Sequence, residues 1–370
     1  MLGISESSHP AHHRFPVWWT GDDKSLSYSI NSMVQAGVSG LKPYVHSDCG
    51  GVADKKTGLV QVGEFVRWSQ HCALGSIHRY HGGPGHQAWL YSEEVEGIVR
   101  NFLQMRMKLM PTMLAAAEQA SLDATPIVQR LDLVYPDAKY LPNSSSTSQY
   151  LFAGDDLLVA PFSQGTENAT REVWLPPGSW RDAWTGAATM GPRRVSSTQP
   201  LARIPIWHRE GGMLVTAPYA QTIDEQDWSE LTVHLFPTSP EEPITASTMR
   251  VTREAEDTSG QGKHSHELTL RQDAGTLHLA ISPACGKRPR SWLVRCHLPR
   301  GVRIASASHG RARLVSPPAA EDAEFVPLGG EGAAPPFLAG AVVEFRLTTV
   351  EGTANNVALT FAKSGLAALD

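Results

Sequence analysis

The side chains best suited to chemistry lie within residues 14–81, where carboxylates, an arginine, a histidine and tryptophans follow short apolar runs. Asp22 follows two tryptophans and a glycine, and Asp48 precedes a Gly-Gly pair. An α/β barrel keeps its reactive side chains at the ends of its strands. The chemistry that suits such a set is cleavage of a glycosidic bond, which needs a carboxylic acid at the leaving oxygen and a carboxylate at the anomeric carbon.

Asp22 is the candidate proton donor. Burial against apolar rings raises a carboxyl pKa and keeps the acid protonated near neutral pH. Trp18 and Trp19 supply such rings, and Gly21 gives a turn that allows close approach to a sugar. A turn or a helix N-cap is the alternative role for Asp22, although Asp23 fits the N-cap better because it directly precedes the next helical segment.

Asp48, Arg79 and His81 are candidates for binding sugar hydroxyls. Arg79 and His81 are two residues apart, so on a strand their side chains would point to one side. The alternatives are an Asx-turn for Asp48 and a structural or surface role for His81. The histidine pairs at 12/13 and 78/81 have no accompanying carboxylate cluster, so no metal site is expected.

Apolar runs and helix-period segments alternate up to about residue 125, which indicates βα units. Pro111 should kink the last helix, and Pro43 weakens the second strand. An eight-unit barrel needs more units than these, so residues 1–124 are predicted to be the last part of a (β/α)8 barrel. Strands are expected over residues 15–19, 41–45 and 76–80, and helices over 26–35, 62–74 and 93–118.

From residue 125 onward, proline and glycine punctuate short alternating runs, which is typical of antiparallel sheets. We predict a proximal β-sandwich over 125–220 and a distal β-sandwich over 221–370, with a linker at 237–243. The fold class is therefore α/β followed by all-β. Strands are expected over 126–134, 157–161, 173–175, 180–184, 204–207 and 213–216, and then over 231–236, 267–271, 276–282, 292–298 and 342–347.

Composition restricts the partners. The 370 residues carry a formal net charge of −5 and show no basic stripe with interleaved aromatics, so no nucleic-acid partner is expected. No run of 18 apolar residues predicts a membrane span, and the polar first 14 residues do not resemble a signal peptide. These features do not assign the protein to a cellular compartment.

Four cysteines, at positions 49, 72, 285 and 296, are too few for a disulfide scaffold. Buried free thiols are the expected state. Cys285 and Cys296 flank a hairpin pattern and would be able to pair in an oxidising compartment, but their spacing does not decide this.

Several motifs together resemble glycoside hydrolase family 31, whose members include retaining α-glucosidases and α-xylosidases. The similarity extends over about residues 7–217. The matching motifs are FPVWWTGD (15–22), SDCGG (47–51), EFVRW (64–68), RYHG (79–82), QYLFAGDDLLVAP (149–161) and LPPGSW (175–180).

The resemblance implies roles for individual residues. Asp22 would be the general acid/base, and Trp19 would form a wall of the −1 subsite. Asp48, Arg79 and His81 would bind hydroxyls of an α-linked oligosaccharide or glycoside. The resemblance implies no cofactor.

Three departures from the family pattern qualify this expectation. These 370 residues contain no Trp-x-Asp-Met-Asn-Glu-like block, which carries the nucleophile in the family. Glu6-Ser7 stands where the family has Arg-Ser, and Val52 replaces an aromatic residue. We therefore expect a C-terminal portion of a longer α-glycosidase that lacks the N-terminal half of the barrel. The alternatives are a non-catalytic carbohydrate-binding or scaffold homologue and a different barrel hydrolase that uses Asp22 with His81.

Overall fold

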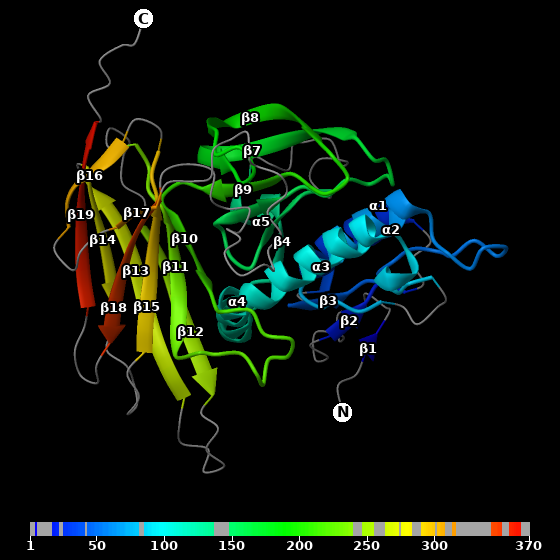
Figure 1. The fold of residues 1–370 in the computed structure, drawn as a ribbon, viewed down its shortest axis with the longest axis horizontal. Coiled ribbons are helices and arrows are strands. Elements are labelled where there is room, and N and C mark those ends of the chain that lie inside the picture. Colours follow the sequence, from blue (N-terminus) through cyan, green and yellow to red (C-terminus); the bar gives the residue numbers. More distant parts are fainter. Residues whose placement is uncertain are drawn as a thin grey trace, which may run out of the picture.

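Parallel strands and helices make up the N-terminal part of the computed structural model (Figure 1). Strands β1 (Ile4–Ser5), β2 (Val17–Trp19) and β3 (Tyr44–His46) form a parallel sheet in the order β1-β2-β3. The helices are α1 (Leu26–Gly40), α2 (Val62–Ala73), α3 (Glu93–Lys108) and α4 (Met110–Asp123), with a 3-10 turn at Ala88–Leu90. The structure describes residues 4–5, 17–21, 25–40, 43–80, 85–136, 148–239, 246–254, 263–273, 275–282, 290–299, 302–307, 313–315, 342–349 and 355–363.

The strand predicted over residues 76–80 is wrong. This segment forms bends and a single parallel bridge between Cys49 and Tyr80. The hydroxyl of Ser76 accepts a hydrogen bond from the backbone N–H of Val45 at 2.7 Å and donates one to its carbonyl at 2.9 Å. The Ser76 hydroxyl therefore satisfies the backbone N–H and carbonyl of Val45 at the edge of β3, where a neighbouring strand was expected. The third strand of the sheet is β1 instead.

The predicted helix over 93–118 is two helices, not one kinked helix. α3 begins with Ser92 as N-cap, whose hydroxyl accepts from the backbone N–H of Val95. α3 ends at Lys108, and Pro111 lies in the first turn of α4. Proline is tolerated there because the first N–H groups of a helix have no intrahelical acceptor. No helix in the described part of the chain is long and apolar enough to span a membrane.

An antiparallel six-stranded sheet follows, in the order β4-β5-β6-β9-β7-β8. Its strands are β4 (Val128–Arg130), β5 (Tyr150–Phe152), β6 (Leu157–Val159), β7 (Ala169–Asp182), β8 (Ala188–Gln199) and β9 (Ile206–Arg209).

Two predictions within this sheet are corrected. The strand expected over 126–134 is the short β4 followed by the helix α5 (Leu131–Val134). The strands expected over 173–175 and 180–184 belong to the single strand β7, whose pairing with β8 shifts between Leu175 and Gly178. Pro176 and Pro177 occupy the shift, and proline has no N–H for the ladder. β8 was not predicted; most of its residues are exposed.

The rest of the described chain forms two five-stranded sheets (Figure 1). Ring contacts join them, since His266 of one sheet meets Trp292 of the other with ring centroids 5.3 Å apart. The first sheet has the order β10 (Gly212–Thr216), β11 (Glu230–Phe236), β15 (Arg290–His297), β18 (Val342–Thr349) and β17 (Arg313–Val315). The second has the order β12 (Ala246–Glu254), β13 (Lys263–Asp273), β14 (Thr276–Ile281), β19 (Asn355–Lys363) and β16 (Val302–Ala307).

Strand pairing crosses the division expected at residue 220. β10 pairs with β11 along its whole length, so β10 belongs to the C-terminal sheets. The segment 237–243, predicted as a linker between domains, instead follows β11 and precedes β12. It therefore connects the two five-stranded sheets; its residues 240–245 lie outside the described part.

Arg67 on α2 joins the helical part to the six-stranded sheet. Its side chain is fully buried, and its guanidinium lies 4.5 Å from the centre of the Phe162 ring. Every acceptor that it reaches is neutral. They are the side-chain oxygen of Gln70 and the backbone carbonyls of Thr166, Glu167, Gln199, Pro200, Leu201 and Arg203. Burial lowers the pKa of Arg67 to about 10, so the side chain stays charged at pH 7.

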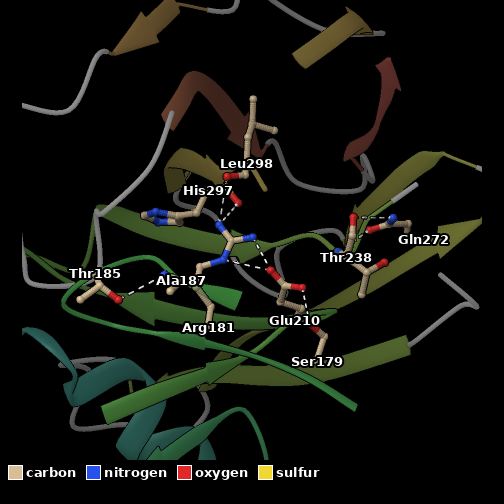
Figure 2. Close-up of polar contacts among 9 residues, drawn as sticks. All are labelled: Ser179, Arg181, Thr185, Ala187, Glu210, Thr238, Gln272, His297 and Leu298. Carbon is tan, nitrogen blue, oxygen red and sulfur yellow. Dashed lines mark hydrogen bonds and ion pairs between the residues drawn. The ribbon is translucent and has the colours of Figure 1, made fainter. Parts of the chain in front are cut away.

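A buried ion pair joins the six-stranded sheet to the C-terminal sheets. Arg181 of β7 donates from Nε to Oε1 of Glu210 at 3.0 Å and from Nη1 to the carbonyls of His297 at 2.9 Å and Leu298 at 3.1 Å. Figure 2 shows the guanidinium between this carboxylate and the two carbonyls. Ser179 donates to the other Glu210 oxygen at 2.6 Å, so the buried charges are matched by hydrogen bonds.

Three neutral histidines pack beside this ion pair. His208 stacks on Phe236 with centroids 4.2 Å apart, and Phe236 stacks on His297 at 4.8 Å. His297 Nε2 lies 3.1 Å from Nδ1 of His234. Burial lowers the pKa of His234 to about 3 and lowers the pKa values of His208 and His297 well below the usual range, and the charge of Arg181 acts in the same direction on these two.

Replacing Arg67 with methionine should lower the free energy of unfolding by about 3–5 kcal/mol, because buried carbonyls lose a charged donor. Arg100→Met on the exposed face of α3 is the matched control and should change it by less than about 1 kcal/mol. Urea denaturation of both variants measures the difference. Equal stabilities would show that Arg67 does not hold the two parts together.

The free energy of unfolding should fall as the pH drops below about 6.5, the pKa of an unfolded histidine. The folded state binds fewer protons than the unfolded state in this range, so each depressed histidine contributes up to about 1.4 kcal/mol per pH unit. The contribution of His234 is lost between about pH 6.5 and about pH 3.

His208→Phe keeps a ring against Phe236 and should reduce this slope by about 1.4 kcal/mol per pH unit between pH 6 and pH 4. Trp89→Phe, at an exposed position of the 3-10 turn, removes no ionisable group and should leave the slope unchanged. Denaturant titrations at several pH values give both slopes. An unaltered slope in His208→Phe would contradict the assignment.

Candidate active site

The structure brings three of the five predicted site residues together. Trp19 ends β2, Asp48 lies two residues beyond β3, and Arg79 lies beyond α2. The ends of parallel neighbouring strands meet at one edge, which explains why Trp19 and Asp48 are close. Asp22 and His81 lie outside the described residues, so their positions stay predictions.

The carboxylate of Asp48 is the centre of the cluster. The indole Nε1 of Trp19 donates to Oδ1 of Asp48 at 2.8 Å, and Nη2 of Arg79 lies 3.6 Å from the same oxygen. The Asp48 side chain is 7% exposed, whereas that of Arg79 is 56% exposed. The carboxylate is therefore fixed from two sides, while the guanidinium keeps access to solvent.

His46 is a member of this cluster that the sequence analysis missed. Arg79 donates from Nε to Nε2 of His46 at 3.1 Å, which places the ring proton of a neutral His46 on Nδ1. The carbonyl of His46 accepts from the backbone N–H of Thr20 at 3.0 Å, continuing the β2–β3 pairing beyond Trp19. Its position as the last residue of an apolar run before Asp48 was the available signal.

A disulfide fixes the loop that carries Asp48. Cys49 and Cys72 are bonded, with Cα atoms 6.1 Å apart, so the prediction of free thiols is wrong for this pair. Cys49 also donates from its backbone N–H to the carbonyl of Arg79 at 3.3 Å. The residue after Asp48 is thus tied both to α2 and to the Arg79 segment. Cys296 is a free, buried thiol.

The two glycines after Asp48 make room for protein side chains. Gly50 and Gly51 have φ values of +107° and +82°, which favour glycine. A Cβ at Gly50 would lie 2.8 Å from the ring of His86, and one at Gly51 would lie 3.0 Å from the ring of Trp68. His86 also contacts the Gly51 carbonyl through Nε2 at 2.8 Å. The rings of His86 and Trp68 therefore occupy the space beside these glycines.

Two further histidines near the cluster are unsuited to acid/base chemistry at neutral pH. Burial lowers the pKa values of His71 and His78 to about 3, and the positive charge of Arg106 acts in the same direction on His78. Both rings are therefore neutral at pH 7 and cannot act as imidazolium proton donors. Among the described residues, no group of three or more His, Cys, Asp or Glu has a geometry that would hold a metal ion.

Comparison with known proteins identifies the family. Residues 1–116 match the family 31 glycosyl hydrolase TIM-barrel domain, and residues 124–214 match the family 31 C-terminal domain. The chain belongs to glycoside hydrolase family 31, as the sequence motifs predicted.

The relatives share a modest level of identity with this chain. α-Glucosidase 2 of Bacillus thermoamyloliquefaciens is 26% identical over 234 residues, which are 60% of this chain and 28% of that protein. The α-xylosidase of Emericella nidulans is 28% identical over 227 residues, which are 57% of this chain and 28% of that protein. The aligned part of the chain therefore covers less than a third of the length of these two relatives.

Solved structures share the fold. A family 31 dextranase of Flavobacterium johnsoniae in complex with glucose matches with a TM-score of 0.75 and 22% identity, covering 94% of this chain and 44% of that one. The family 31 α-xylosidase of Xanthomonas citri matches with a TM-score of 0.67 and 21% identity, covering 92% and 35%.

Removing the disulfide with the double change Cys49→Ala and Cys72→Ala should cost about 3 kcal/mol of stability, because the bond closes a loop with a sequence separation of 23. A reductant present throughout denaturant unfolding should lower the midpoint of the parent chain and leave that of the double variant unchanged. Peptide mapping without reductant checks the pairing directly. Free thiols at both positions in the folded protein would contradict it.

Proposed function

We propose that this chain provides the acid/base and sugar-binding side of a retaining α-glycoside hydrolase. The observation that carries the proposal is the Asp48 carboxylate, which the Trp19 indole and the Arg79 guanidinium approach at the ends of parallel strands. A carboxylate next to a guanidinium suits the hydroxyl groups of a sugar, since one accepts and the other donates hydrogen bonds. The family relationship supplies the class of substrate.

Each predicted residue takes one role in this proposal. Asp22 would protonate the leaving oxygen and then activate water, as the second carboxyl of a retaining pair does. Asp48, Arg79 and His81 would bind hydroxyls of the sugar in the −1 subsite, and Trp19 would form a wall of that subsite. The substrate would be an α-linked glucoside or xyloside, in line with the α-glucosidase and the α-xylosidase among the relatives.

We infer a three-part organisation for the chain. Residues 1–124 would be the last three βα units of a (β/α)8 barrel, followed by a proximal β-sandwich to about residue 211 and a distal β-sandwich from β10 onward. The parallel order β1-β2-β3 supports the barrel part, and the contact between the two five-stranded sheets supports the distal sandwich. The proximal part has one six-stranded sheet in the described residues. The earlier barrel units, including the nucleophile, would come from protein sequence outside these 370 residues.

A carbohydrate-binding homologue without turnover is the second candidate. The sequence observation in its favour is that these 370 residues contain no nucleophile block. The coding sequence upstream of Met1 discriminates the two candidates: a Trp-x-Asp-Met-Asn-Glu-like block there supports the hydrolase. Its absence from the complete gene favours the binding protein.

The 370-residue chain alone should show no turnover of aryl α-glucosides or aryl α-xylosides, because a retaining mechanism without its nucleophile cannot form the glycosyl-enzyme. The longer polypeptide that includes the nucleophile block should be active. Asp22→Asn should reduce its kcat/KM by about 100-fold or more. Release of the aryl group measures both.

Glu94→Gln on α3 is the control for these assays and should leave kcat/KM of the longer polypeptide within about twofold, because it makes the same carboxyl-to-amide change at an exposed position outside the Asp48 cluster. Clear turnover by the 370-residue chain that Asp22→Asn abolishes would overturn the assignment of the nucleophile to other sequence.

A further inference from the structure

A cavity lies where α1 meets β7 and the loop that precedes it. It has a volume of about 450 Å³, within the range of small-molecule sites. Ser27 and Asn31 of α1 form one side, and Gln164, Thr166 and Asn168 of the loop form the other. It shares no residue with the Asp48 cluster.

The lining of this cavity is polar and almost free of net charge. Eight of its twelve residues carry a neutral hydroxyl or amide, and one arginine and one glutamate balance each other. The guanidinium of Arg171 is already engaged, because it donates to the carbonyls of Ser148 and Pro161 and to the Ser148 hydroxyl. An anion such as phosphate therefore finds no uncommitted cation here.

One buried acceptor in the lining lacks a donor. Oδ1 of Asn31 is inaccessible to solvent and makes no hydrogen bond among the described residues. An unsatisfied buried acceptor is unfavourable, and rotation of the Asn31 amide toward the cavity would let a ligand hydroxyl donate to this oxygen. Apolar ligands are disfavoured, since only Phe162 and Ala169 offer apolar side chains.

We propose that this cavity binds a neutral saccharide through its hydroxyl groups, as a second sugar site at the seam between α1 and the six-stranded sheet. Donors and acceptors on short neutral side chains match the alternating hydroxyls of a sugar. The proposal does not require turnover at Asp48. It is therefore open to test in the 370-residue chain.

Calorimetric titration of the chain with maltotriose tests the site. The chain is made in a bacterial host, so that the Asn168-Ala169-Thr170 sequon stays unmodified. Asn31→Leu and Gln164→Leu should each weaken binding at least fivefold. Gln221→Leu is the matched control, because Gln221 is also an exposed glutamine but lies outside the cavity. Unchanged thermal midpoints verify that the variants are folded.

Asp48→Asn separates this site from the one proposed for catalysis. It should leave the Asn31-dependent binding of maltotriose unchanged. The proposal is overturned if maltotriose does not bind, if binding survives both Asn31→Leu and Gln164→Leu, or if inorganic phosphate competes with it. If only the hydrolase assay gave a negative result, the conclusion from maltotriose binding would still hold, because the two experiments depend on different residues.

Discussion

The buried guanidinium of Arg67 is the interaction on which the arrangement of the helical part and the sheets depends. A charge inside a protein is stable only when it is paired or hydrogen-bonded. Here the partners are neutral backbone carbonyls from two separate loops, near residues 166 and 200. One side chain on α2 thereby fixes the path of both loops, and these hydrogen bonds would be lost if the helix and the sheet separated.

The same helix connects this anchor to the Asp48 cluster. Cys72, five residues after Arg67, is bonded to Cys49, which directly follows Asp48. The hydroxyl of Ser69 accepts from Tyr80, the residue after Arg79. Both the carboxylate and the guanidinium of the cluster are therefore adjacent in sequence to residues that α2 holds, and the position of α2 is in turn fixed by Arg67.

The join to the C-terminal sheets follows a different physical solution. Arg181 and Glu210 form a buried ion pair whose remaining groups are hydrogen-bonded, so neither charge is isolated (Figure 2). The histidines beside it are held neutral by burial, and this contact is consequently sensitive to acid. The groups that accept hydrogen bonds from Arg67 are amide and carbonyl oxygens, which do not titrate near neutral pH.

The sequence by itself determined the family, the change from α/β to β structure near residue 125, and the candidates Trp19, Asp48 and Arg79. Local patterns suffice for these, because periodicity and motif order are properties of short segments. Only the tertiary structure showed the Cys49–Cys72 disulfide, the contribution of His46 and the crossing of the expected boundary by β10. These depend on which distant segments meet. Pairing partners far apart in sequence leave no local pattern, since the contact free energy exists only once the chain has folded around them.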